Sequence, residues 1–78
     1  MIKDRRVRAV KYTGSTHNGT KVAALCGQYM KKASFELGGN DPFLALRDCN
    51  VEKAVNAAFT SRMVANAQAC INAKRFLV

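Results

Sequence analysis

The chain is organised around Ser34-Phe35-Glu36-Leu37-Gly38-Gly39-Asn40-Asp41-Pro42-Phe43, a short apolar run that carries one carboxylate and ends in two glycines and a turn. A thiol lies further along, in Asn66-Ala67-Gln68-Ala69-Cys70. Glu36 at the mouth of a strand and Cys70 in a loop of small residues are the two parts that nucleophilic attack on a carbonyl carbon needs. Sulfur attacks the carbon, and the carboxylate moves protons.

On the N-terminal side of this stretch, the pattern predicts a strand, a turn and a helix. Arg6 to Thr13 partly alternates charged and apolar residues and is rich in β-branched side chains, which is typical of a strand. Gly14-Ser15-Thr16 supplies the turn. Lys31-Lys32 is placed to close the following helix, because cations complement its carboxyl-end dipole. The apolar positions that recur at helical spacing are Val22, Leu25, Cys26, Tyr29 and Met30.

On the C-terminal side, the pattern predicts further strands around a second helix. Ala33 to Leu37 is a strand, and Phe43 to Leu46 is a short strand of the buried type found in parallel sheets. Asn50 is the expected N-cap of the second helix, which ends around Val64 to Asn66, and Lys74 to Val78 begins a last strand. The apolar stripe that we expect this helix to bury in the core is Val51, Ala54, Val55, Ala58, Phe59 and Met63. The fold class is therefore α/β, in the order β-α-β-β-α-β.

Length and charge restrict the possible functions. A chain of 78 residues is at most one small domain and buries only about 60% of its unfolded surface. The formal net charge is +8, and its densest cluster is Lys3, Arg5, Arg6, Arg8 and Lys11. Such a balance raises affinity for phosphates, nucleic acid and acidic membranes, yet no aromatic residue interleaves with this cluster. We expect neither nucleic acid nor a membrane as a partner, and acidic residues elsewhere in a parent chain to offset the charge.

The cysteines favour a reducing compartment. Cys26, Cys49 and Cys70 are an odd number at irregular spacing, and no signal-peptide core precedes them. They lack the paired Cys/His spacing of a zinc site, so we expect no metal. No apolar run is long enough to span a membrane. These features indicate a cytoplasmic protein and are compatible with the mitochondrial matrix.

Several motifs, in this order, resemble the aldehyde dehydrogenase superfamily. They are Tyr12-Thr13-Gly14-Ser15-Thr16 with Gly19 after it, Glu36-Leu37-Gly38-Gly39, Gln68-Ala69-Cys70, and Ala73-Lys74-Arg75-Phe76. The family's fold needs several times this length, so the chain resembles an internal piece. Residues 1–37 correspond to the end of the cofactor-binding portion and residues 38–78 to the start of the catalytic portion. Gly-Gly-Asn-Asp-Pro-Phe and Cys-Ile-Asn-Ala-Lys-Arg-Phe look most like the succinate-semialdehyde dehydrogenase branch.

The resemblance implies oxidation of an aldehyde to a carboxylic acid with NAD or NADP, by a full-length parent that forms a homo-oligomer. By this resemblance Cys70 is the nucleophile that forms a thiohemiacetal and then a thioester. Glu36 is the general base that activates water for hydrolysis of that thioester. The residues alone also allow a second interpretation of Cys70, as a buried thiol that does not react.

The resemblance also implies where the cofactor lies. The Ser15 hydroxyl meets the cofactor pyrophosphate, Gly14 and Gly19 let the backbone and helix approach it, and Leu37 and Gly38 lie against the nicotinamide. From the residues alone, the Gly/Ser/Thr turn can also be explained as an ordinary turn that caps a helix, with no cofactor involved.

The nucleophile loop departs from the family pattern. Glycine commonly precedes the Gln-x-Cys segment, and this chain has Ala67 there, where a positive φ would cost alanine about 1 kcal/mol or more. Family members usually carry an asparagine two places before that glycine, whereas this chain has Ala65 there and Asn66 one place later. Two alternatives to an active enzyme therefore stay open: an inactive remnant of the family and a small basic nucleic-acid-binding module.

Overall fold

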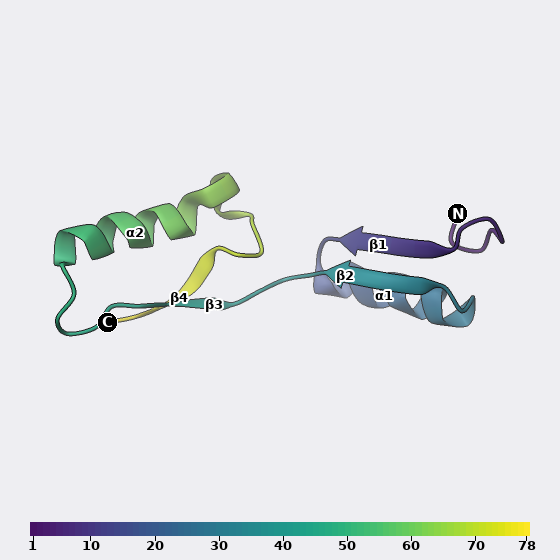
Figure 1. Cartoon of the computed structure of the whole chain (residues 1–78), viewed down its shortest axis with the longest axis horizontal. Helices are drawn as coiled ribbons and strands as arrows, with labels where there is room; N and C mark the ends of the chain where they lie inside the picture. Colours follow the sequence, from purple (N-terminus) through teal and green to yellow (C-terminus); the bar gives the residue numbers. More distant parts are fainter. The chain divides into compact units, whose positions relative to one another are not determined.

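The computed structural model describes all residues from Met1 to Val78 and has an α/β fold. Its elements follow one another along the chain in the predicted order (Figure 1). They are β1 (Ala9–Thr13), α1 (Thr16–Gln28), β2 (Lys32–Glu36), β3 (Asp41–Leu44), α2 (Val51–Met63), the 3-10 helix η1 (Val64–Ala67) and β4 (Ala73–Leu77). Two compact units result, Met1–Gly38 and Gly39–Val78. Neither helix has the length and apolar character that a membrane crossing requires.

The first unit is a parallel β-α-β crossover. β1 pairs with β2 from Ala9 opposite Lys32 to Thr13 opposite Glu36, and α1 packs on both strands. The helix face that meets the strands includes Cys26, which is only 2% exposed. The predicted place of Cys26 on the apolar face of this helix is confirmed.

The start of α1 lies earlier than the apolar repeat alone indicates. Ser15 is its N-cap, and its Oγ accepts a hydrogen bond from the Asn18 N–H at 3.3 Å. This bond satisfies one of the first-turn N–H groups that have no acceptor within the helix. The helix therefore begins directly after the turn, at Thr16.

The end of α1 also differs from the prediction. The helix ends at Gln28, and Met30 adopts a φ of 50° and is 92% exposed, so it lies outside the expected apolar face. The Lys31 N–H donates to the Cys26 carbonyl at 2.9 Å, which satisfies a last-turn carbonyl through the backbone. The prediction that Lys31 and Lys32 close the helix is wrong, because this left-handed turn ends it and Lys32 already belongs to β2.

The second unit is another parallel crossover. β3 pairs with β4, and the register shifts between Asp41 and Pro42. β3 begins before the predicted Phe43, because Pro42 lacks only an N–H group and fits at this irregular edge. The Phe43 and Phe76 ring centroids lie 5.7 Å apart across the pair.

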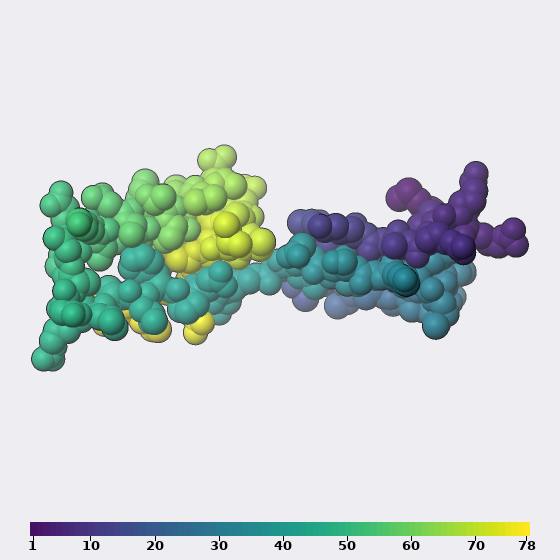
Figure 2. Space-filling view, viewed as in Figure 1, coloured from purple at the N-terminus to yellow at the C-terminus, as the bar shows by residue number.

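Helix α2 begins as predicted but does not bury the expected stripe. Asn50 Oδ1 accepts a hydrogen bond from the Lys53 N–H at 3.0 Å, which confirms the N-cap. Figure 2 shows α2 (green) against β4 (yellow), yet no α2 residue is buried. Val55 and Phe59 are 62% and 67% exposed. The core prediction is wrong for this stripe, because a sheet of two strands is too narrow to cover a helix face.

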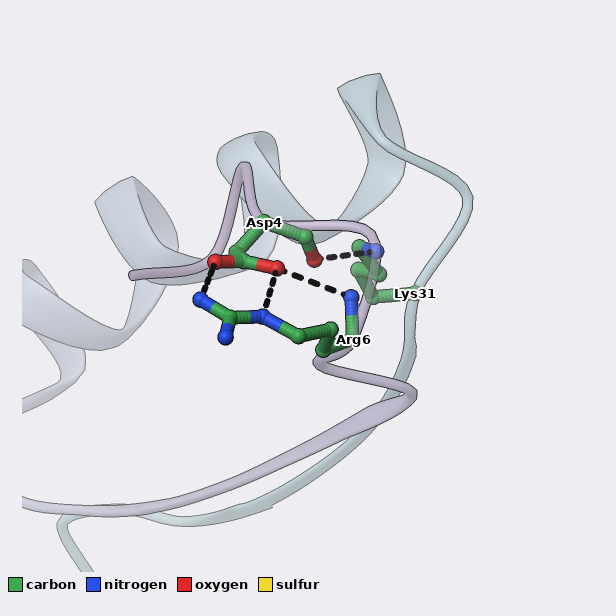
Figure 3. Close-up of polar contacts among 3 residues, drawn as sticks. All are labelled: Asp4, Arg6 and Lys31. Atoms are coloured by element: carbon green, nitrogen blue, oxygen red, sulfur yellow. Dashed lines mark hydrogen bonds and ion pairs between the residues drawn. The ribbon is translucent and has the colours of Figure 1, made fainter.

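The N-terminal segment carries an ion pair between Asp4 and Arg6 and is tied to the rest of the first unit by Lys31. Arg6 Nη2 and Nε lie 2.7 and 3.0 Å from the two Asp4 carboxylate oxygens (Figure 3). The Lys31 ammonium donates to the Asp4 backbone carbonyl at 3.0 Å. The side-chain hydrogen bonds from Arg6, together with the bond from its backbone N–H, lower the pKa of Asp4 from 3.8 to about 2.

This pKa predicts an acid transition at Asp4. Because the folded-state pKa lies below the unfolded value, the interaction favours the folded chain above about pH 4 and is lost as pH falls through about 2. An NMR titration of the Asp4 carboxyl carbon should give a midpoint near 2. Arg6→Gln should return the midpoint toward 3.8, and Arg5→Gln, which removes an unpaired neighbour, should not. A midpoint near 3.8 in the unsubstituted chain would contradict this account.

Candidate active site

The turn after β1 forms an anion-binding geometry at the carboxyl ends of the first two strands. The Gly14 N–H donates to the Glu36 carbonyl at 3.0 Å, and the Gly19 N–H donates to the Ser15 carbonyl at 2.8 Å. The first-turn N–H groups of Thr16 and His17 have no acceptor within the helix. Although Ser15 Oγ accepts the capping bond, its hydroxyl hydrogen is free to donate. Free N–H groups, a hydroxyl and a helix N-terminus suit a phosphate group.

The residues predicted to contact a cofactor lie together in this unit. A Cβ atom at Gly19 would lie 2.5 Å from Leu37 Cδ2, so α1 approaches the end of β2 as closely as glycine allows. A Cβ atom at Gly38 would lie 3.5 Å from Thr16 Oγ1. The structure thus brings five predicted residues together at the carboxyl ends of β1 and β2, namely Gly14, Ser15, Gly19, Leu37 and Gly38. Their roles toward a cofactor stay predictions.

Glu36 ends β2 beside this turn. Its backbone carbonyl holds the Gly14 N–H, whereas its side chain is exposed and forms no ion pair or hydrogen bond. A carboxylate without a partner is free to take a proton from water.

The loop that carries Cys70 starts in a strained backbone conformation. Ala65, Asn66 and Ala67 have φ values of 49°, 55° and 63°. Ala67 therefore does adopt the conformation that favours glycine, at a cost of about 1–2 kcal/mol. Such strain persists only where surrounding contacts hold it, and it is frequent at functional sites.

Two side chains hold the strained segment. Arg62 Nη1 donates to the Ala67 carbonyl at 3.2 Å. Asn72 is fully buried, and its Nδ2 donates to the carbonyls of Arg62 and Val64 at 2.6 and 2.9 Å. Asn72 Oδ1 has no hydrogen-bond partner. The sequence did not identify either residue as functional. The one signal concerned Asn72, an amide side chain among small residues just after the candidate nucleophile Cys70.

Cys70 itself is a free, exposed thiol, as is Cys49 in the loop before α2. The Lys74 ammonium, which sequence reasoning also missed, donates to the Cys70 carbonyl at 2.9 Å. Glu36 belongs to the first unit and Cys70 to the second, so the structure positions each within its own unit. No group of three or more His, Cys, Asp or Glu side chains is placed to hold a metal ion.

Three arginines of the basic cluster line an open groove in the first unit. The groove has a volume of about 910 Å³, and Tyr29 lies in its wall. The Lys3 ammonium lies 5.9 Å from the Tyr29 ring centroid. No aromatic residue interleaves with the cluster in the sequence, but the fold brings Tyr29 beside it from the end of α1. The basic side chains that line the groove are Arg5, Arg6, Arg8, Lys31 and Lys32.

Curated proteins similar to this chain are succinate semialdehyde dehydrogenases. The NAD(P)+ enzyme Sad of Escherichia coli (strain K12) is 46% identical over 78 residues, which is 100% of this chain and 17% of that protein. The NADP(+) enzyme of Mycobacterium avium (strain 104) is 44% identical over 78 residues, 16% of its length. The chain thus spans about a sixth of the curated relatives it matches.

Solved structures agree with this grouping. The succinate-semialdehyde dehydrogenase of Burkholderia pseudomallei matches with a TM-score of 0.88 and 36% identity, over 96% of this chain and 16% of that one. The succinic semialdehyde dehydrogenase of Streptococcus pyogenes, solved with NADP+, matches with a TM-score of 0.86 and 37% identity over the same shares. The model of the aldehyde dehydrogenase family matches residues 1–78. The chain belongs to the aldehyde dehydrogenase family.

Proposed function

We propose that this chain supplies the nucleophile, the general base and the phosphate-binding turn of an enzyme that oxidises an aldehyde to a carboxylic acid. The observation that carries the proposal is the position of Glu36. It ends β2 with a free carboxylate, and its own carbonyl binds the Gly14 N–H of the turn. A backbone hydrogen bond therefore links the proposed base directly to the proposed phosphate site.

The proposed reaction begins at Cys70. Its thiolate adds to the carbonyl carbon of the aldehyde and forms a thiohemiacetal, and loss of a hydride from that carbon leaves a thioester on sulfur. Glu36 takes a proton from water, which attacks the thioester carbon and releases the acid and the thiolate. Cys70 thereby returns to its starting state, and the substrate has lost two electrons.

NAD or NADP is the proposed cofactor, and its nicotinamide supplies the hydride acceptor when bound. The turn at Gly14 and Ser15 would hold its pyrophosphate, while Leu37 and Gly38 would lie against the nicotinamide ring. Relatives named for NAD(P)+ and for NADP(+) support this choice. They also make succinate semialdehyde the first substrate to test. We propose that the assembled enzyme is a cytoplasmic homo-oligomer.

The division of roles predicts that two substitutions impair different steps of the reaction. The test enzyme is a chimera in which residues 1–78 replace the matching segment of the E. coli relative. Cys70→Ser should lower NAD(P)H formation by roughly 10³-fold or more, because a hydroxyl is a far weaker nucleophile. Glu36→Gln should keep a first-turnover burst of NAD(P)H and slow later turnovers by roughly 10²- to 10⁴-fold.

Glu52→Gln, in the first turn of α2, is the matched control for charge and should leave both phases unchanged. Unchanged turnover in Cys70→Ser would overturn the assignment of the nucleophile. An inactive chimera that binds cofactor would instead support the inactive-remnant alternative.

The thiols should differ in their rates of alkylation in the same chimera. Cys70 should react first with limiting iodoacetamide, because a nucleophile must be reachable by substrate. Cys26, which is 2% exposed, should react last. Cys49 is an exposed thiol outside the site and gives the reference rate. Peptide mapping by mass spectrometry measures the order, and labelling of Cys26 or Cys49 ahead of Cys70 would count against the proposal.

A further inference from the structure

The Lys74 ammonium donates hydrogen bonds to three backbone carbonyls in and next to the loop that carries Cys70. Its Nζ donates to the carbonyl oxygens of Ala69, Cys70 and Asn72 at 3.3, 2.9 and 3.1 Å. An ammonium group has three N–H donors and no acceptor, so these bonds use its full capacity. Bonds from a charged donor are roughly twice as strong as neutral ones.

Two of these bonds act on the peptide groups on either side of Cys70. The Ala69 carbonyl belongs to the peptide that precedes the Cys70 Cα, and the Cys70 carbonyl belongs to the peptide that follows it. Because peptide groups are planar, fixing both carbonyls fixes the two backbone dihedrals of Cys70. The direction of its Cα–Cβ bond is then set, and the sulfur is confined to the staggered χ1 positions about that bond.

Gly39 confines the same carbonyl from a second side. A Cβ atom at Gly39 would lie 2.6 Å from the Cys70 carbonyl oxygen, which is closer than real side chains approach. Backbone contact with Gly39 and the Lys74 hydrogen bond therefore leave this peptide little room to rotate. Arg62 and Asn72 hold the strained segment before the thiol, whereas Lys74 holds the peptides of the thiol residue itself.

We propose that Lys74 is a positioning residue that aims the Cys70 thiol by holding the carbonyls on both sides of it. The proposal rests on the proposed function and adds to it a residue that touches no reacting atom. Lys74 stands in β4 between Ala73 and Arg75, which pair with Asp41 and Pro42 of β3, so its backbone is the unpaired residue of the register shift and lies outside the loop that it binds.

Burst kinetics of the chimera described above separate positioning from a general loss of structure. Lys74→Met keeps the length of the side chain and removes all three donors. It should slow the first-turnover rate constant by roughly 10- to 100-fold, because small misplacements of a reacting group have effects of this size. In the Glu36→Gln background, where deacylation stays the slowest step, the burst amplitude per folded enzyme should stay unchanged. The KM for the cofactor should also stay unchanged, since the phosphate turn belongs to the other unit.

Two further variants sharpen the test. Lys74→Arg keeps the charge, but its planar fork does not match three converging carbonyls, so its rate should lie between those of Lys74→Met and the unsubstituted enzyme. Lys53→Met, at an ammonium that makes no hydrogen bond, is the matched control and should change nothing. A lower amplitude with an unchanged rate constant in Lys74→Met would show a merely structural role and overturn the proposal. Full rescue by arginine would also overturn it and show an effect of charge alone.

Hydrogen exchange on the same chimera gives a readout that needs no activity. Lys74→Met should raise deuterium uptake in residues 69–73 and leave residues 51–63 of α2 unchanged. Equal deuterium uptake of residues 69–73 in Lys74→Met and in the unsubstituted protein would overturn the proposed role of Lys74, even if the chimera were inactive. Failure of the proposed function is distinguishable, because it appears as a persistent burst in Cys70→Ser, whatever Lys74→Met does.

Discussion

Parallel pairing of strands across a helical crossover is the constraint on which each candidate site residue depends. In the first unit it brings the carboxyl ends of β1 and β2 to one edge, so the Gly14 turn lies beside Glu36 and Leu37. In the second unit the register Asp41 to Ala73 brings the amino ends of β3 and β4 together. Gly39, which precedes β3, therefore meets the carbonyl of Cys70, which precedes β4.

Glycine and alanine act in opposite ways at this second edge. Gly39 permits a backbone approach that a Cβ atom would block. Ala65 and Ala67 adopt positive φ without the freedom of glycine, and each costs about 1–2 kcal/mol. The loop therefore depends on side chains that reach back to its carbonyls. Arg62 and Asn72 supply those bonds around the strained segment, and Lys74 supplies them beside the thiol.

Local signals in the sequence predicted much of the fold. Asn50 caps α2 as expected, and the Gly-Ser-Thr turn lies where its residue types place it, because caps and turns depend on neighbouring residues alone. The burial of Val55 and Phe59 was predicted wrongly, because helical periodicity shows which residues share a face and not what covers that face. The carbonyl bonds of Lys74 were missed because the backbone that it binds carries no side-chain signature.

The central claim is that Cys70 carries the acyl group during the reaction, and trapping that intermediate tests it most directly. The Glu36→Gln chimera would be mixed with succinate semialdehyde and NAD(P)+, quenched in acid within the first turnover, digested, and analysed by mass spectrometry. The account predicts that the peptide containing Cys70 is heavier by one succinyl group. An acyl group on Cys26 or Cys49, or NAD(P)H release with no acylated cysteine, would contradict it.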